Sequence, residues 1–220
     1  MQYLILLFIE LVLLYFLAKK LTSRTYQLIY RLTKNKNWAS YLLAILFLPG
    51  TFVHEVSHAL AALFLLVPFG EVEFLPQIQG EQIKMGSVGI SKTDPIRRFL
   101  IGIAPFVMGT SLILGGLYYL SENSFFLNPY CMLITAYLIF AIGNTMFASK
   151  KDLEGAFQLF LFILLIYLLI FVLGIRFPFL NLKNIFTKEL VDVLKISNIF
   201  LLIPLGLGTL IVITFKFLKL

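Results

Sequence analysis

The sequence predicts an all-α, polytopic membrane protein with about six transmembrane helices. Of its 220 residues, 60% are hydrophobic and only 13% are charged, and the mean hydropathy is +0.95. Soluble domains are roughly 45–50% apolar and about 25% charged, so a soluble globule could not bury this many apolar side chains. Disordered chains are polar and poor in aromatic residues, which excludes that class too. Since a span needs about 20 apolar residues, this length allows about six spans in a single membrane domain.

Six apolar segments are the candidate spans: about 1–18, 39–67, 98–120, 130–148, 155–175 and 196–215. No basic residue precedes the first of them, whereas Lys19 and Lys20 follow it. This order is the reverse of that in a signal peptide, so we expect the segment to be retained as a span. The expected location is therefore a membrane crossed several times, and we take this to be the cell membrane of a prokaryote.

Three connections between the spans carry further signals. Residues 19–38 hold six of the 18 basic residues among apolar ones, which indicates an interfacial amphipathic helix and not a nucleic-acid site. The runs Glu71–Gln77 and Gln82–Ile90 alternate polar and apolar side chains around Gln79-Gly80-Glu81. They predict a β-hairpin, with an irregular polar loop as the alternative. Residues 184–195 predict a short amphipathic helix at the surface.

The second span contains the pattern H-E-x-x-H. It begins four residues after Gly50 of the pair Pro49-Gly50, which we expect to break the helix. His54 and His58 lie one turn apart on one helical face, so both imidazoles can bind one zinc ion. Glu55 can then act as general base on a zinc-bound water. These are the only histidines in the chain, and idle ionisable groups are costly at membrane depth. The alternative is a buried polar cluster that specifies helix packing.

A catalytic zinc ion usually has three protein ligands and one open position. No third histidine exists, so the remaining ligand must be a carboxylate or Cys131. Asp152 and Glu154 are the candidates, in a short polar break between the fourth and fifth spans; an ordinary solvated turn is the alternative. Cys131 is explained more simply as a small apolar residue at the start of a helix.

These features resemble the site-2 protease family of intramembrane zinc metalloproteases, over about residues 39–160. That family has H-E-x-x-H within a span, a hairpin after it, and a later motif of the form N-x-x-P-x-P-x-x-D-G. The resemblance implies that Asp152 is the third zinc ligand, and that Asn144, eight residues earlier, holds the substrate or the transition state. The segment Ile101–Pro105 is similar to the family's A-G-P-containing helix. The chain departs from the motif in lacking both prolines and in having Leu153 where glycine is usual.

The resemblance implies a zinc-dependent endopeptidase that cleaves a membrane protein or peptide within or next to the lipid bilayer. In that reading, the hairpin offers an edge strand that pairs with an extended substrate. One alternative is a catalytically inactive, metal-binding membrane scaffold. Another is a metal or ion transporter, although a transport path usually has acids or histidines on several spans. Here Glu10 is the only other acid deep in a span.

Overall fold

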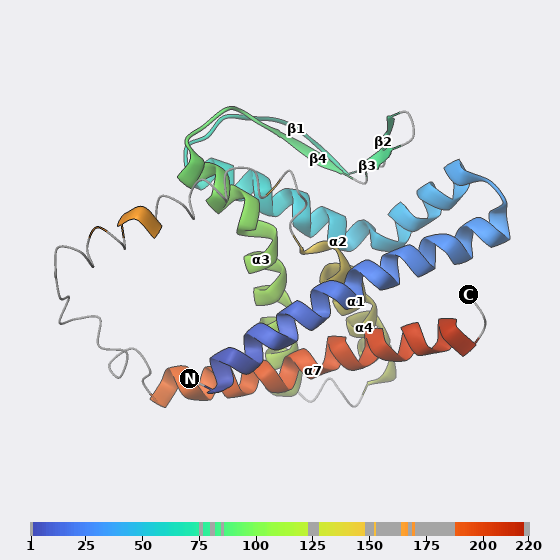
Figure 1. The fold of residues 1–220 in the computed structure, drawn as a ribbon. Helices are drawn as coiled ribbons and strands as arrows, with labels where there is room; N and C mark the ends of the chain where they lie inside the picture. Colours follow the sequence, from blue (N-terminus) through green and yellow to red (C-terminus); the bar gives the residue numbers. More distant parts are fainter. Residues whose placement is uncertain are drawn as a thin grey trace.

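The computed structural model describes residues 2–74, 77–79, 82–84, 86–122, 128–147, 152, 164–166, 169 and 188–217. This part of the chain is mostly helical, which confirms the all-α prediction (Figure 1). Its long helices are α1 (Gln2–Thr33), α2 (Lys36–Phe64), α3 (Pro95–Glu122), α4 (Pro129–Thr145) and α7 (Lys188–Phe217).

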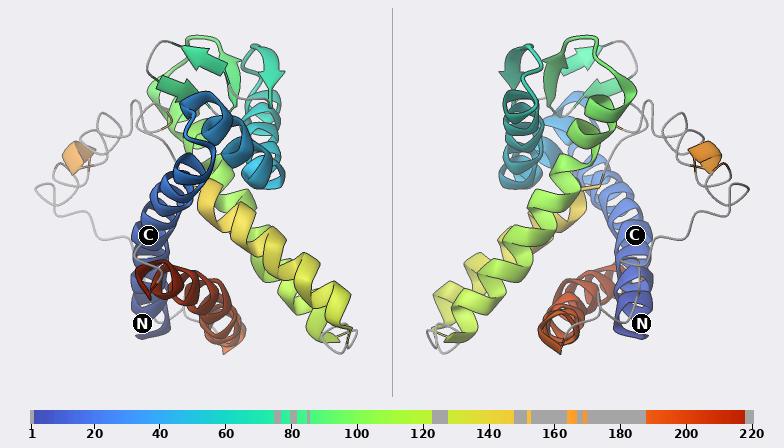
Figure 2. Two further views of the ribbon diagram at one scale, coloured as in Figure 1. Left: turned by 90° about the vertical axis from the view of Figure 1, so that its right-hand side faces the viewer. Right: turned by 90° about the vertical axis from the view of Figure 1, so that its left-hand side faces the viewer.

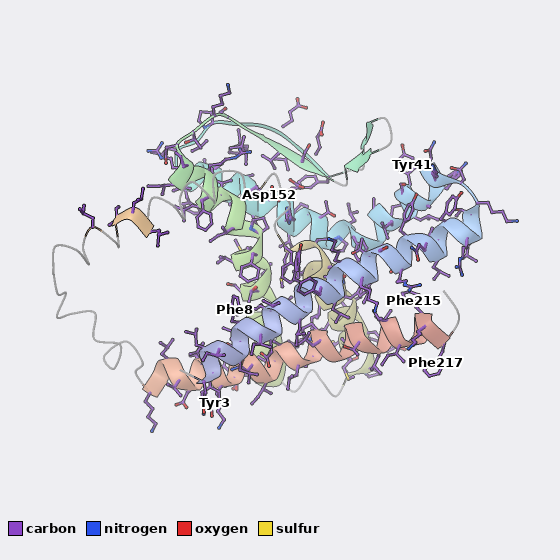
Figure 3. The ribbon with its side chains drawn as sticks, viewed as in Figure 1. Tyr3, Phe8, Tyr41, Asp152, Phe215 and Phe217 are labelled. Carbon is purple, nitrogen blue, oxygen red and sulfur yellow. The ribbon has the colours of Figure 1, made fainter. Side chains whose placement is uncertain are left out.

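Three of the described helices are long and apolar enough to cross a membrane, namely Lys36–Phe64, Pro95–Leu120 and Leu190–Phe217, and α4 is a shorter apolar helix. The outer surfaces of the long helices are strongly apolar. Phe8 of α1 is 68% exposed, and Phe217 of α7 is 84% exposed (Figure 3). Monomeric soluble proteins rarely expose apolar surface on this scale, whereas lipid would cover it. The predicted number of about six spans stays a prediction. The predicted spans 1–18 and 130–148 belong to α1 and α4, which are not among these three, and 155–175 lies almost wholly outside the described residues.

The predicted interfacial helix at 19–38 is not a separate element. Helix α1 runs without interruption from Gln2 to Thr33, because its buried stripe of Leu14, Ala18, Leu21 and Thr25 continues through the basic region. The helix ends where Lys34 adopts a positive φ of 51°. Asn35 then caps α2, since its side chain accepts hydrogen bonds from the next turn's backbone. In the same way, residues 188–195 of the predicted surface helix form the first turns of α7.

Pro49-Gly50 does not break the second span, contrary to the sequence prediction. Helix α2 continues through both residues. A methyl group at Gly50 would overlap the carbonyl of Ala141 and the side chain of Thr145 on α4. Glycine is therefore needed for the close crossing of α2 and α4, and this crossing brings the end of α4 next to His54.

The β-hairpin prediction is confirmed. Strand β1 (Phe69–Glu73) pairs antiparallel with β4 (Ser87–Ile90), and β2 (Gln77–Gln79) pairs antiparallel with β3 (Gln82–Lys84). The hairpin lies along α2 (Figure 1). Phe74 holds one part of it through a ring contact with Phe52 of α2, at 5.0 Å between centroids. Ile90 anchors the base by packing against the buried cluster of Ala62, Val67 and Ile101.

Helix α3 begins at an aspartate cap directly after the hairpin. The Oδ1 atom of Asp94 accepts hydrogen bonds from the backbone amides of Ile96 and Arg97, at 3.1 and 3.0 Å. The bond from the Arg97 amide contributes most to holding the pKa of Asp94 below its usual value, so this carboxylate stays ionised. Pro95 occupies the first helical position, where its missing N–H costs nothing.

The main hydrophobic core joins α1, α3, α4 and α7. It consists of Leu14, Ile113, Leu117, Ile139, Ile142, Met146 and Leu201. Figure 2 shows α3 and α4 lying side by side and separating from α1 and α7 at the end away from the hairpin. The hairpin, the hairpin-side part of α2 and the end of α4 meet at the other end, and the polar side chains discussed below gather there.

Candidate metal centre

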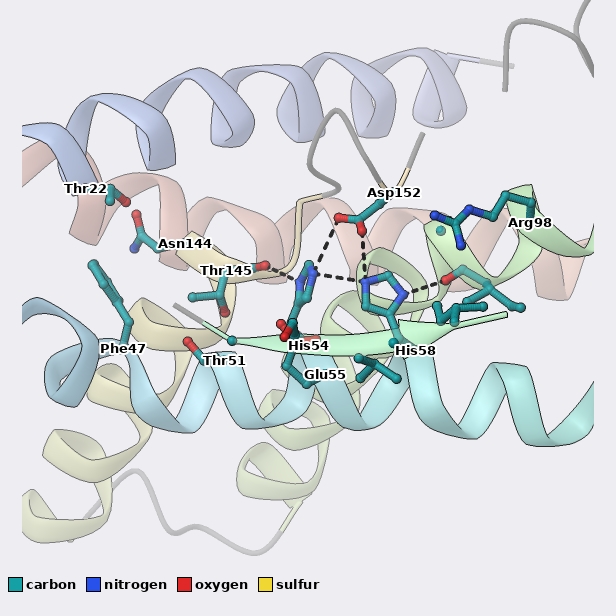
Figure 4. Close-up of a pocket in the computed structure, with 17 residues that line it drawn as sticks. Thr22, Phe47, Thr51, His54, Glu55, His58, Arg98, Asn144, Thr145 and Asp152 are labelled. Atoms are coloured by element: carbon teal, nitrogen blue, oxygen red, sulfur yellow. Dashed lines mark hydrogen bonds and ion pairs between the residues drawn. The ribbon is translucent and has the colours of Figure 1, made fainter. Parts of the chain in front are cut away.

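Three side chains from two distant segments of the sequence converge beneath the hairpin: two from α2 and one from residue 152. The Nε2 atoms of His54 and His58 are 3.2 Å apart. Asp152 places Oδ1 at 3.3 Å from Nε2 of His58 and Oδ2 at 3.7 Å from Nε2 of His54 (Figure 4). Their ligand atoms all lie within 4.8 Å of one another, a grouping that could hold a metal ion. The structure thus brings together the three side chains that the sequence suggested as ligands.

Both imidazoles are fixed through their other ring nitrogen. Nδ1 of His54 lies 2.6 Å from the carbonyl oxygen of Thr145, and Nδ1 of His58 lies 2.9 Å from that of Ile101. A carbonyl can only accept, so each Nδ1 carries the proton and donates it. A neutral imidazole then has its lone pair on Nε2. Two lone pairs and a carboxylate therefore converge on one region, and a cation there, a proton or a metal ion, would stabilise them.

The carbonyl that holds His54 comes from a helix end. Thr145 is the last residue of α4, and the last carbonyls of a helix lack a partner within it. The close α2–α4 crossing at Gly50 presents this carbonyl to the histidine. Such a second hydrogen bond, fixing the tautomer and orientation of the ring, is typical of histidines that bind metals.

Asp152 reaches the histidines because α3 has a glycine beneath it. A methyl group at Gly102 would overlap the backbone carbonyl of Asp152. The side chain of Asp152 is 18% exposed, and it points from above toward the histidine rings of α2 (Figure 4). Of the other ligand candidates, Glu154 lies outside the described residues. Cys131 lies in the first turn of α4 and does not belong to the converging group.

We expect Gly102→Ala to weaken metal binding at least about tenfold, because the added methyl displaces the Asp152 backbone and disturbs the ligand set. The measurement is the zinc dissociation constant of the purified protein in competition with a chelating dye. Gly116→Ala is the matched control, since a methyl at this position of the same helix meets no atom of the described residues within 4 Å. Equal affinities in the two variants would contradict the argument.

Glu55 lies in the same cavity, one residue after His54 and only 7% exposed. Its carboxylate lies against the hairpin: a methyl group at Gly86 would sit 2.9 Å from Oε1 of Glu55 and 2.8 Å from Cγ2 of Thr51. The hairpin therefore covers this carboxylate at a glycine, where the backbone can come close.

Asn144 also lines the cavity. Its Nδ2 donates to the carbonyl of Phe140 at 2.6 Å, and its buried Oδ1 has no hydrogen-bond partner in the described part of the chain. Asn144 therefore brings a buried acceptor that lacks a described partner into the wall of the cavity. A contact to an oxyanion would have to use the second N–H of Nδ2, since the first is donated to Phe140.

The cavity has a volume of about 500 Å³ and extends along β4, from Gly86 to Ile90. This volume lies within the range of small-molecule binding sites. Arg98 of α3 contributes a basic side chain to the wall. Arg98 and Gly86 could not be predicted as parts of the site, because no local sequence pattern distinguishes them from an ordinary helix or turn residue. Gly102 belongs to the segment Ile101–Pro105 noted above, but its contact with Asp152 has no sequence signal.

Comparison with protein-family models, with curated proteins and with solved structures gives no match. The functional argument therefore depends on the geometry of the residues themselves.

Proposed function

We propose that the protein is a zinc-dependent endopeptidase that hydrolyses peptide bonds of membrane-spanning or membrane-adjacent segments. The observation that carries the proposal is the convergence of His54, His58 and Asp152 with both histidine Nδ1 atoms bonded to carbonyls. Glu55, in the same cavity, adds the acid–base group that hydrolysis needs.

The donor set and its spacing fit zinc. Two ligands about 2.0–2.1 Å from a tetrahedral ion are separated by roughly 3.3–3.4 Å. The two Nε2 atoms are 3.2 Å apart, close to that value. Nε2 of His58 lies 3.3 Å from Oδ1 of Asp152 and Nε2 of His54 lies 3.7 Å from Oδ2, so each imidazole approaches a different oxygen of the carboxylate. Two imidazoles and one carboxylate also match the three protein ligands of catalytic zinc sites, which leave one position open. When bound, zinc would polarise a substrate carbonyl and lower the pKa of water.

Glu55 is the proposed general base. It would take a proton from the attacking water and later pass a proton to the leaving amine. Its burial keeps bulk water away from the carboxylate, and its position after His54 places it beside the ligand set without making it a ligand. Asn144 would accept a hydrogen bond from a substrate N–H and so help to orient the cleaved segment.

The hairpin supports a route for substrate binding. A peptide bond inside a helix is shielded by the helix's own hydrogen bonds, so a substrate must unwind locally before cleavage. Strand β4 pairs with β1 on one edge only, and within the described residues its other edge has no strand partner. Because Gly86 to Ile90 line the cavity, an extended substrate that pairs with this edge would lie next to Glu55.

We expect Gly86→Ala to lower the cleavage rate at least tenfold while zinc content stays at one per chain, because its methyl displaces the Glu55 carboxylate and the strand above it. Cleavage is measured on protein of known zinc content. Gly70→Ala is the control: among the described residues its methyl would meet only the Gly89 carbonyl, at 3.7 Å, which is an ordinary contact distance. A Gly86→Ala enzyme as fast as the control would show that close contact between hairpin and Glu55 is unimportant.

The two alternative functions make different predictions in one experiment. A scaffold would hold zinc and cleave nothing, with Glu55→Gln changing neither property. A transporter would carry metal across a proteoliposome membrane and would need a chain of polar groups through it. Glu10, the other acid deep in a predicted span, is 4% exposed on α1 and does not line the cavity. Zinc content, metal uptake and cleavage of a membrane substrate, measured together, separate the three functions.

A further inference from the structure

We propose that Pro105 is a positioning residue of the metal centre. It frees the backbone carbonyl of Ile101, and this carbonyl holds His58 in the orientation and tautomer that metal binding needs. The inference depends on the metal centre of the proposed function but not on peptide hydrolysis.

The argument begins with the hydrogen-bond pattern of α3. In an α-helix the carbonyl of residue i accepts from the N–H of residue i+4. The donor for Ile101 would be residue 105, which is a proline and has no N–H. The helix nevertheless continues on both sides, from Pro95 to Glu122. The carbonyl of Ile101 therefore loses its regular partner in the middle of a long helix, and the proline ring pushes it away from the helix axis.

His58 supplies the missing donor. Its Nδ1 lies 2.9 Å from the oxygen of Ile101, across the contact between α2 and α3. All the groups involved are buried: His58 is 4% exposed, Ile101 is 1% exposed, and Pro105 is below 2%. An unpaired buried donor or acceptor destabilises the folded protein. One hydrogen bond removes that cost for both the carbonyl and the imidazole, so the pair is strongly favoured.

This bond determines where the metal-binding nitrogen points. With the proton held on Nδ1, the lone pair of His58 lies on Nε2, which faces Nε2 of His54 at 3.2 Å and Asp152 at 3.3 Å. The carbonyls that accept hydrogen bonds from the two histidines are thus available for different reasons. His54 uses the end of α4 at Thr145, and His58 uses a carbonyl that proline releases inside α3.

Proline inside a helix is not sufficient for this role. Pro49 in α2 and Pro204 in α7 also lie within helices, and by the same count they release the carbonyls of Ile45 and Phe200. Neither carbonyl is the acceptor of a histidine Nδ1, since His54 and His58 donate to Thr145 and Ile101. The placement of Pro105 four residues after the acceptor of His58 is therefore the specific feature, and Pro204 provides a matched control.

The test compares the zinc affinity of the full-length wild-type protein, Pro105→Ala and Pro204→Ala, by competition with a chelating dye. In Pro105→Ala a new backbone N–H competes for the Ile101 carbonyl and draws it back toward the helix axis. We expect zinc affinity to fall about 10–100-fold, the usual effect of losing a hydrogen bond to a ligating histidine. Pro204→Ala should stay within about twofold of the wild type.

Unchanged affinity in Pro105→Ala, or an equal loss in Pro204→Ala, would overturn the inference and leave the zinc centre intact. A wild-type protein that binds no zinc would overturn the centre itself and the inference with it. A second measurement does not depend on the variant folding. In nitrogen-15 NMR of the wild type, His58 should carry its ring proton on Nδ1, with a downfield hydrogen-bonded signal. A proton on Nε2 instead would overturn the inference.

Discussion

Replacing Glu55 with glutamine is expected to lower turnover by about 10²–10⁴-fold and to leave the zinc content unchanged. Glutamine preserves the shape of the buried side chain but cannot accept the proton of the attacking water. The ligand set of His54, His58 and Asp152 does not include Glu55, so metal binding should persist. The measurement is the cleavage rate per zinc-loaded molecule in a reconstituted bilayer.

The control for this variant is Glu73→Gln. Glu73 belongs to β1, where its Oε2 accepts a hydrogen bond from Ser87, and it does not line the cavity. The Glu73→Gln variant removes one carboxylate from the same region without touching the proposed base. The turnover of this variant should therefore match that of the wild type. Wild-type turnover in Glu55→Gln would exclude the general-base mechanism.

Removing the Asp152 carboxylate is expected to empty the metal centre. Two imidazoles alone are an incomplete zinc site, so Asp152→Ala should lose zinc in a chelator wash that the wild type survives. Losing the hydrogen-bond partner of a ligating histidine typically lowers metal affinity by about 10–100-fold. The loss in Asp152→Ala should be larger, because a ligand itself is removed. Zinc is measured by elemental analysis of the washed protein.

Glu154→Ala is the matched comparison, since Glu154 is the other acid of the same polar segment. It should keep its zinc. If Glu154→Ala is the variant that loses zinc, the alignment with the site-2 protease motif is wrong by two positions. If both keep zinc, the third ligand lies elsewhere and Cys131 is the next residue to test.

Two of the three candidate ligands could be predicted from spacing within the sequence. His54 and His58 share a helical face through their i, i+4 spacing. Asp152 could be chosen only through the resemblance, eight residues after Asn144. The β-hairpin was likewise predictable, because side-chain alternation in Glu71–Gln77 and Gln82–Ile90 is a local property.

The supporting geometry could not be predicted, because it comes from contacts between distant segments. The carbonyls of Thr145 and Ile101 carry no side-chain signal, although Pro105 marks the second in retrospect. The pair Pro49-Gly50 is typical of a helix break, but here Gly50 allows the close crossing of α2 and α4. The prediction of a separate interfacial helix over 19–38 was also wrong. The basic residues suggested it, but the buried packing of α1 continues through them to Thr33.

The most direct test of the proposed function is mass spectrometry of transmembrane peptides incubated with the zinc-loaded wild-type protein in proteoliposomes. The panel should include spans with central glycine, proline or asparagine, which unwind more readily. We expect cleavage within or next to the span, lost when zinc is removed and restored when zinc is returned. A protein that holds one zinc ion per chain and leaves every peptide of the panel intact would contradict the assignment as an intramembrane endopeptidase.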